Sequence, residues 1–241
     1  MPLPVESSHP EPRPGVERLE AFSDGVFSII ITLLVLDLRV PHRDVLGGRA
    51  LSDALIAQWP NYAAFILSFL LVGVVWSNHR AMFQYIRQLD HALVVLNTLL
   101  LLCVAVLPFT AALLAEYVHG TADQQRLAAL VYSGTLVVGG VAFNSVWWHA
   151  ARAQLTESAE ATAELRAVGR FWLLGPVLYS LAFALAFVSF TLSLTLYVLL
   201  ILYFAISGTW LTRHLGAWRR KVRPVARRET QDPIDGENAG L

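Results

Sequence analysis

No Asp, Glu, Lys or Arg lies among the 42 residues between Arg170 and Arg213. One helix of that length would be about 60 Å long at 1.5 Å per residue, which is twice the hydrocarbon thickness of a bilayer, about 30 Å. The stretch therefore has to fold back on itself, most simply near Ser189–Ser193. It predicts two membrane-spanning helices, the fifth and sixth of the chain, with a very short connection.

Four further apolar runs are long enough to cross a membrane, which takes about 20 apolar residues. Only 15% of the 241 residues are charged, against about 25% in soluble domains, and the mean hydropathy is +0.53. The chain is therefore predicted to be an all-α membrane protein with six transmembrane helices. The first four cover residues 20–40 and the runs between Asp53 and Arg80, Asp90 and Glu116, and Arg126 and Arg152.

Lysine and arginine are distributed unevenly between the two sides of these spans. With the N-terminus in the cytoplasm, the inner segments hold 14 of them and the outer loops 4, as expected because cytoplasmic loops are enriched in both residues. We predict a disordered, Pro- and Glu-rich tail (1–16), a six-span domain (17–218) and a basic, polar cytoplasmic tail (219–241). The basic run predicts contact with anionic lipid; a regulatory or protein-binding role is the alternative.

The first span carries a hydroxyl-bearing face. At about 100° per residue, Ser28 and Thr32 share one face with the bulky aliphatic residues Ile29, Leu33 and Leu36. Such a face suits a narrow aqueous path, because hydroxyl oxygens can replace part of a cation's hydration shell and aliphatic rings can close a pore by dewetting. One helix cannot enclose a path, so this interpretation requires several copies around an axis. The alternative is ordinary helix packing, with the hydroxyls bonded to their own helix.

Asp24 lies inside the first span, where a charge costs about 2.5 kcal/mol or more at the helix centre. It therefore needs a partner, and the second span ends with Trp76, Asn78 and His79 on the same predicted cytoplasmic side as Arg18 and Asp24. These side chains predict one hydrogen-bonded cluster. The cluster either orients the helices or, through Asp24 and His79, relays protons, because histidine titrates near neutral pH.

Other classes of function find little support in the sequence. There is no H-E-x-x-H motif, paired-cysteine metal site, phosphate loop or serine elbow, and the single cysteine, Cys103, lies in an apolar run. We therefore predict no enzyme activity, no cofactor and no resident metal. Nucleic-acid binding is not expected either, because the basic run is short and abuts a span.

The polar residues of the first three spans give the chain a resemblance to a known family. This is the endolysosomal potassium channel family, transmembrane protein 175, with its bacterial and archaeal members. The resemblance is strong over the first half of the chain, whereas the second half fits mainly by having three more spans. It is carried by Arg18-x-x-x-Phe22-Ser23-Asp24, by Ser28, Ile29 and Thr32, by Leu36-Asp37-Leu38-Arg39-Val40-Pro41, by Trp76-x-x-His79-x-x-x-Phe83, by Asn97, and by Leu107-Pro108-Phe109.

This resemblance implies a homotetramer with the four first helices around a central pore, in the plasma membrane of a prokaryote. It implies that Ile29 forms the main constriction, that Leu33 and Leu36 add further layers, and that Thr32 and Ser28 contribute to cation preference. The implied function is passive conduction of K⁺, the permeant ion. The residues themselves leave proton conduction or proton-coupled transport through Asp24 and His79 as the alternative. It also implies a structural network near the cytoplasmic side, formed by Arg18, Phe22, Ser23, Asp24, Trp76 and His79.

Overall fold

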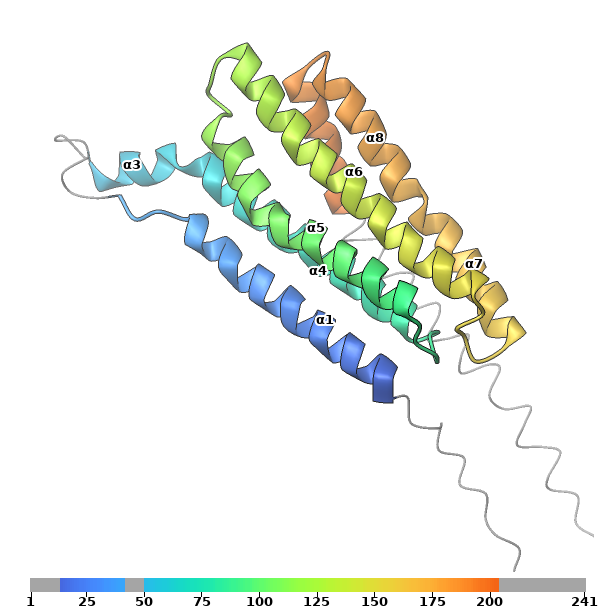
Figure 1. Ribbon diagram of the computed structural model, residues 1–241. Coiled ribbons are helices and arrows are strands. Elements are labelled where there is room, and N and C mark those ends of the chain that lie inside the picture. Colours follow the sequence, from blue (N-terminus) through green and yellow to red (C-terminus); the bar gives the residue numbers. More distant parts are fainter. Residues whose placement is uncertain (1–13, 42–49, 204–241) are drawn as a thin grey trace, which may run out of the picture.

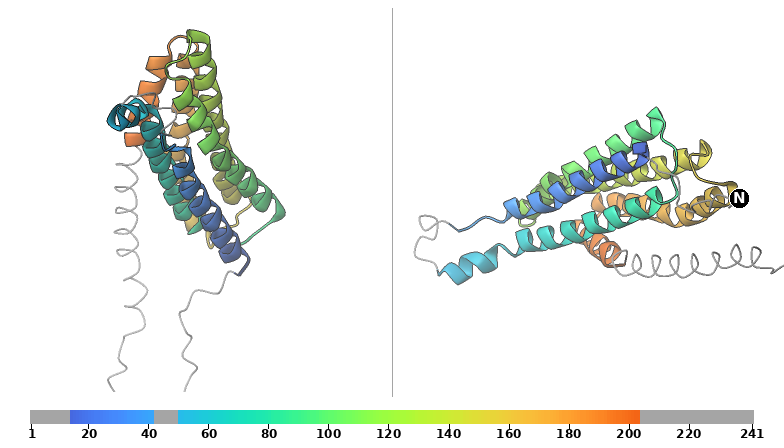
Figure 2. Two further views of the ribbon diagram at one scale, coloured as in Figure 1. Left: turned by 90° about the vertical axis from the view of Figure 1, so that its left-hand side faces the viewer. Right: turned by 90° about the horizontal axis from the view of Figure 1, so that it is seen from below.

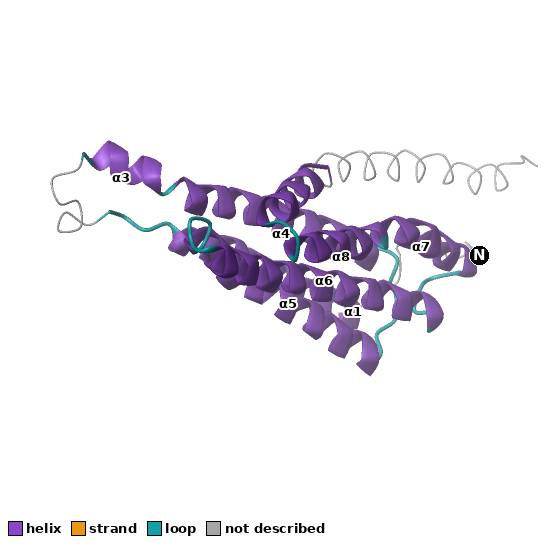
Figure 3. Cartoon of the chain, turned by 90° about the horizontal axis from the view of Figure 1, so that it is seen from above, coloured by secondary structure: helices purple, strands orange, loops and turns teal. Residues whose placement is uncertain are grey.

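The computed structural model describes residues 14–41 and 50–203, and all of their regular structure is helical (Figures 1 and 3). The helices are α1 (Pro14–Leu33), the 3₁₀ helix η1 (Leu34–Asp37), α3 (Leu51–Ala57), α4 (Trp59–Phe83), α5 (His91–Glu116), α6 (Ala122–Arg152), α7 (Ala159–Trp172) and α8 (Leu174–Ala186). A further apolar helix runs over Phe190–Tyr203.

Five segments are long and apolar enough to cross a membrane. They are Gly15–Asp37, α4, α5, α6 and the nearly continuous pair α7–α8, Ala159–Ala186. The predicted all-α membrane architecture is thus confirmed with five candidate spans and one shorter apolar helix. The rest of the predicted sixth span lies outside the described residues, as do residues 1–13 of the predicted N-terminal tail and the whole predicted C-terminal tail.

The predicted fold-back is confirmed. α8 ends at Ala186 and the next helix begins at Phe190, so the connection is only three residues long. Ser189 accepts a hydrogen bond from the Leu192 N–H, and the buried Ser193 hydroxyl donates to the Ala182 carbonyl of α8 at 2.8 Å. The two small polar residues therefore cap the new helix and tie it back to α8.

Two helix boundaries differ from the sequence prediction. The fifth span begins at Ala159 rather than after Arg170, because α7 is amphipathic: it exposes Arg166 and Arg170 while burying Leu165 and Val168. Because of the charged residues on its exposed face, α7 is not part of a charge-free run, and the sequence prediction did not include it. α1 begins at Pro14, so residues 14–16 of the predicted tail are helical. Proline suits the first position of a helix, where its missing N–H would have no partner.

The helices pack side by side in chain order from one flank of the bundle to the other. α1 packs on α4 and α5, α5 packs on α6, and α6 carries α7 and α8 on its far side (Figures 1 and 2). One buried apolar cluster runs through the bundle, from Phe27 of α1 through Leu100 of α5 to Phe143 of α6 and Trp172 of α7. α1 thus lies on a flank of the single chain, and α3 projects beyond one end of the bundle (Figure 3).

At one end of the bundle, Asp90 connects the start of α5 to the end of α6. Asp90 caps this helix, because its Oδ1 accepts the Leu93 N–H at 2.7 Å, and its Oδ2 lies 2.7 Å from Nε2 of His149 near the end of α6. Partial burial acts to raise the pKa of the Asp90 carboxyl, but these hydrogen bonds outweigh it and hold the pKa below its ordinary value. The carboxylate therefore stabilises the fold in its ionised form.

We predict that Asp90→Ala lowers the free energy of unfolding by about 1 kcal/mol, the usual contribution of a helix N-cap. Because the pKa of Asp90 is lower in the folded state, its stabilisation is full above the unfolded value of about 3.9 and is lost as the pH falls through the lowered folded value. Thermal unfolding in detergent between pH 3 and 7 measures both effects. The exposed Asp123→Ala is the matched control, and equal melting of the two variants would contradict the assignment.

Candidate functional site

α1 has two chemically different faces. Phe27, Ile30 and Leu34 point into the bundle and are at most 3% exposed. Ile29 and Leu36 point away from it, with exposed fractions of 59% and 71%. A helix on the flank of a single chain thus leaves bulky aliphatic side chains without partners among the described residues.

The outward face contains the residues predicted to line a pore. Ser28, Ile29, Thr32, Leu33 and Leu36 are all exposed. Their shared direction confirms the helical periodicity, while their role as pore residues remains a prediction. The change from α-helix to 3₁₀ helix at Leu34 keeps Leu33 and Leu36 together, because residues three apart eclipse each other in a 3₁₀ helix.

The Thr32 hydroxyl forms a hydrogen bond with the backbone of its own helix. Its Oγ1 donates to the Ile29 carbonyl at 2.8 Å, as expected from the alternative that span hydroxyls bond to their own backbone. The two interpretations are compatible, because a hydroxyl that gives its hydrogen to the backbone turns only oxygen lone pairs outward. Such an oxygen can coordinate a cation but cannot donate to an anion.

The Asp24 carboxylate has one partner among the residues of the predicted cluster. Asp24 is half-buried on α1, and its Oδ1 accepts the indole N–H of Trp76 on α4 at 2.8 Å. The Arg80 guanidinium lies over the Trp76 ring, 5.8 Å from its centroid. This arrangement explains how a carboxylate is tolerated inside a span. The Trp76 indole of the next helix donates a hydrogen bond to it, and the Arg80 cation lies against the ring of that indole.

A second set of polar side chains joins three helices in a defined direction. The Ser23 hydroxyl donates to the Leu19 carbonyl at 2.8 Å, so its oxygen is free to accept the Asn97 Nδ2–H at 2.9 Å. The amide oxygen of Asn97 then faces Nε2 of His79 at 2.8 Å. Since that oxygen can only accept, His79 must donate from Nε2 and is the Nε2–H tautomer. Ser23, His79 and Asn97 are 0% exposed, and we call these three residues the polar chain.

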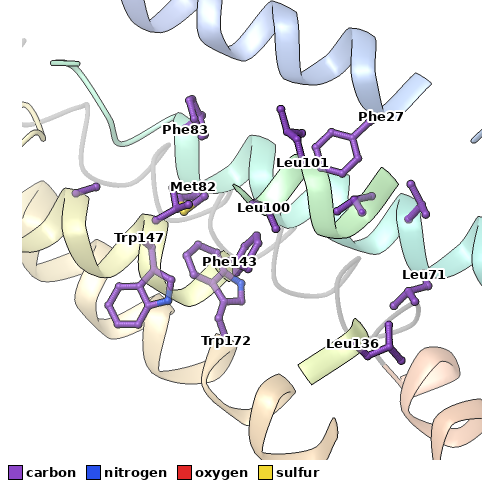
Figure 4. Packing of buried hydrophobic residues seen from close by; sticks show 14 of the residues in the cluster. Phe27, Leu71, Met82, Phe83, Leu100, Leu101, Leu136, Phe143, Trp147 and Trp172 are labelled. Carbon is purple, nitrogen blue, oxygen red and sulfur yellow. The ribbon is translucent and has the colours of Figure 1, made fainter. Parts of the chain in front are cut away.

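Aromatic rings enclose the histidine of the polar chain. The His79 ring stacks on Phe83 with centroids 4.3 Å apart and meets the edge of Phe27 at 5.4 Å. Figure 4 shows Phe27 reaching from α1 into the buried cluster beside Leu101 of α5. The Nδ1 atom of His79 is buried and has no hydrogen-bond partner within residues 14–41 and 50–203. The polar chain is thus surrounded by apolar side chains.

The cluster differs in membership from the one predicted. The structure brings together Ser23, Asp24, Trp76 and His79, but it leaves out Asn78, which lines a cavity on another face of α4. Arg18 is exposed and makes no ion pair or hydrogen bond with any part of the chain that the structure describes, and Phe22 is 58% exposed. Both residues lie on faces of α1 turned away from α4 and α5, so neither reaches the network.

Asn97 belongs to the network, although the predicted cluster did not include it. In the sequence it contributes only to the family resemblance, yet it is the only amide side chain in the charge-free run between Asp90 and Glu116. A polar side chain in such a run requires a partner. The partner could not be identified without knowing that α5 packs against both α1 and α4.

The chain has clear relatives among known proteins. A model of the family described as endosomal/lysosomal potassium channel TMEM175 matches residues 18–108. A potassium channel of Streptomyces collinus is 45% identical over 188 residues, which cover 78% of this chain and 90% of the relative. The crystal structure of a lysosomal potassium-selective channel TMEM175 homolog from Chamaesiphon minutus superposes with a TM-score of 0.73 at 41% identity, over 80% of this chain and 98% of that one.

A vertebrate relative is named as a proton channel rather than as a potassium channel. The human endosomal/lysosomal proton channel TMEM175 is 33% identical over 150 residues, which cover 60% of this chain but only 29% of the human protein.

We predict that Asn97→Leu destabilises the fold by about 2 kcal/mol or more, because it leaves the buried His79 N–H and the Ser23 oxygen unpaired at about 1–3 kcal/mol each. Thermal unfolding of the purified protein in detergent measures the loss. Thr98→Ala is the matched control, since Thr98 neighbours Asn97 but is exposed and bonds only to its own helix. A variant at position 97 that melts with the wild type would show that the polar chain does not hold the helices.

Proposed function

This chain belongs to the TMEM175 family, and we propose that it is a potassium-permeable cation channel whose pore is lined by the outward face of α1. The relatives from Streptomyces and Chamaesiphon, named as potassium channels, support the permeant ion. The observation that carries the pore assignment is the exposure of Ser28, Ile29 and Thr32 on one face of α1. Permeation would be passive, with K⁺ as the only ion required and no cofactor.

We propose a homotetramer with the four α1 helices around its axis. In one chain the face that carries Ile29, Leu33 and Leu36 is between 46% and 71% exposed, and a single helix cannot enclose a path. Closed rotational symmetry would bring equivalent residues to the same level around the axis. Each position on this face would then form a ring of four side chains.

In this assembly different rings of side chains have different roles in the pore. Ile29 forms the main constriction, with Leu33 and Leu36 as further layers toward the outer end, and each layer can close by expelling water. Thr32 and Ser28 supply hydroxyl oxygens on either side of Ile29. Because the aliphatic rings offer no coordinating oxygen, we expect only modest discrimination between K⁺ and Na⁺.

The polar chain and the Asp24–Trp76 hydrogen bond would fix which face of α1 meets the axis. α1 packs only on its own chain's α4, α5 and η1 among the closely packed elements that the structure describes. One residue of helix corresponds to about 100° of rotation, so a small rotation of α1 would replace Ile29 with a different side chain at the constriction. Polar contacts to both neighbouring helices oppose that rotation. Arg18 and Phe22, which lie outside the network, would face the inner entrance.

Proton conduction through Asp24 and His79 is the second candidate function. The name of the human relative and the unpaired Nδ1 of His79 favour it. The hydrogen bonds oppose it: Asp24 is bonded to an indole N–H, which does not exchange protons as a relay, and His79 is bonded to an amide. Under this second candidate, Asp24→Asn and His79→Ala would abolish proton flux while leaving assembly intact.

We place the protein in the plasma membrane of a prokaryote, as a multi-pass protein with both termini in the cytoplasm. The Lys and Arg distribution and the bacterial relatives support this placement. The basic tail, which lies outside the described residues, would then contact the anionic inner leaflet.

We predict that Ile29→Asn and Ile29→Ala raise the K⁺ flux of proteoliposomes several-fold, because a smaller or polar ring no longer dewets. The measurement is K⁺ and Na⁺ flux into liposomes that contain equal amounts of each purified protein. Leu181→Asn, on an exposed position of α8 at the far flank, is the matched control and should leave flux unchanged. A K⁺ flux that is present in the wild type and unchanged at position 29 would remove Ile29 as the constriction, whereas no cation flux from a folded protein would overturn the channel proposal.

We predict that Thr32→Val reduces the preference for K⁺ over Na⁺ toward one without abolishing conductance, because it removes the outward oxygen and keeps the side-chain shape. The reversal potential under K⁺ and Na⁺ gradients gives the permeability ratio. Thr98→Val is the control, since its hydroxyl also bonds to its own helix at 2.8 Å, but on α5. Equal ratios for wild type and Thr32→Val would exclude this hydroxyl from selectivity.

A further inference from the structure

An apolar cavity lies between α4, α5, α6 and the helix Phe190–Tyr203, and neither α1 nor η1 contributes to its lining. Its volume is about 660 Å³, with its open mouth included. Leu67 of α4, Leu114 of α5 and Val198 of the last described helix form part of its wall, and none of the described residues that line it is charged. Cavities of this size, with apolar walls and a few polar groups, are typical binding sites for small molecules.

Two hydroxyl groups in the wall of this cavity lack hydrogen-bond partners in the part of the chain that the structure describes. They belong to Ser68 of α4 and Tyr132 of α6, which are 2% and 4% exposed. A third hydroxyl of the wall, on Tyr197, donates to the Tyr179 carbonyl at 3.2 Å. Buried polar groups normally have a partner, and the hydrocarbon of a bilayer offers none. The hydroxyls of Ser68 and Tyr132 therefore indicate an occupant that carries a hydrogen-bonding oxygen.

The two hydroxyls lie at the deep end of the cavity. Trp59, the first residue of α4, lines the other end and is 50% exposed, as is common for tryptophan at a membrane–water interface. Ser68 follows about 14 Å further along α4, at 1.5 Å per residue. Tyr132 lies about 15 Å from the start of α6, and the two helices begin at the same end of the bundle (Figure 1). The cavity thus has an apolar entrance near the interface and a polar floor inside the membrane-spanning region.

We propose that the cavity binds a small, neutral amphiphile from the bilayer, with a hydroxyl or carbonyl oxygen at the deep end and an apolar body toward Trp59. The described wall carries no charge, which favours a neutral molecule, because a charge would be desolvated there without a counter-ion. Each wall hydroxyl can donate and accept, so a ligand hydroxyl can do either with Ser68 and Tyr132, and a ligand carbonyl can accept from them. A lipid acyl chain alone would fill the space but leave both hydroxyls unpaired.

Aromatic contacts hold the Tyr132 ring in the wall. The ring meets the edge of the Tyr197 ring with centroids 5.6 Å apart, and the Tyr197 ring stacks on Tyr179 with centroids 6.3 Å apart. These contacts involve the rings and leave the Tyr132 hydroxyl to the cavity. Tyr132→Phe therefore removes the hydroxyl and keeps the packing, so it tests recognition of a ligand rather than folding.

The proposed site is separate from the outward face of α1. Ala64 of α4 and Ala111 of α5 line this cavity, and they also line a second cavity beside η1, together with Leu36 and Asp37. The wall between the two cavities is therefore formed in part by these small side chains. A ligand in the first cavity would not enter the proposed pore, so its binding can be measured whether or not the chain conducts K⁺.

The test uses two photoreactive probes of nearly the same shape. The first is octanol with a diazirine in its chain, and the second is the corresponding diazirine-bearing octane, which lacks the hydroxyl. Each probe is added to liposomes that contain the purified protein, and mass spectrometry locates the labelled peptides after illumination. The wild type is compared with Ser68→Ala and Tyr132→Phe. Ser133→Ala is the matched control, because its buried hydroxyl donates to the Ala129 carbonyl of its own helix.

We expect the alcohol probe to label the cavity wall of the wild type saturably. Ser68→Ala and Tyr132→Phe should each reduce that labelling about fivefold, the effect of one hydrogen bond of ordinary strength. Ser133→Ala should leave it unchanged, and the alkane probe should label all four proteins equally. Equal labelling of the four proteins by the alcohol would overturn the proposal. An equal loss of both probes from the variants, or no label in the wall of the folded wild type, would also overturn it.

The wild type alone gives a second measurement, which does not require any variant to fold. Unlabelled octanol should displace the alcohol probe from the cavity wall at a concentration in the bilayer several-fold lower than unlabelled octane does. Equal displacement by the two compounds would show that the cavity takes up alkyl chains without recognising an oxygen, and it would contradict the role of the two hydroxyls.

Discussion

A bilayer offers no hydrogen bonds to polar side chains, and the arrangement of this protein depends on how two helices satisfy the polar groups of a third. Ser23 and Asp24 are adjacent on α1, yet they have different partners. Ser23 accepts the amide N–H of Asn97 on α5, and Asp24 accepts the indole N–H of Trp76 on α4. Two adjacent residues held by two separate helices define the rotation of α1 about its axis. The apolar side chains Phe27, Ile30 and Leu34 then fill the same interface.

The exposed face of α1 follows from that interface. Once Ser23 and Phe27 face inward, helical geometry turns Ser28, Ile29, Thr32 and Leu33 outward, and the 3₁₀ turn keeps Leu36 with them. The network and the proposed pore are therefore two faces of one helix. The polar contacts on one side of α1 therefore determine which side chains its other side exposes.

Much of this arrangement could be predicted from the sequence. Charge-free runs located α4, α5 and α6 because a bilayer excludes charge, and the length of the run after Arg170 required a fold-back. The start of α7 was missed because its charged residues occupy one face only. The placement of Asp24 and Trp76 in one cluster followed from their common side of the membrane, but the part played by Asn97 depended on packing among three helices. Arg18 and Asn78 were assigned to the cluster because they lie at the same level of the membrane, and Phe22 because of the family resemblance. In the described chain the side chains of all three point away from the cluster.

We propose that the outward face of α1 lines a water-filled path for K⁺. Its most direct test is cysteine scanning from residue 27 to residue 36 in a Cys103→Ser protein, with K⁺ current recorded before and after a water-soluble, positively charged thiol reagent. We expect the reagent to change the current at positions 28, 29, 32, 33 and 36 and to leave it unchanged at positions 27, 30 and 34. Modification that follows no helical period, or that affects only the buried positions, would contradict the assignment of this face to the pore.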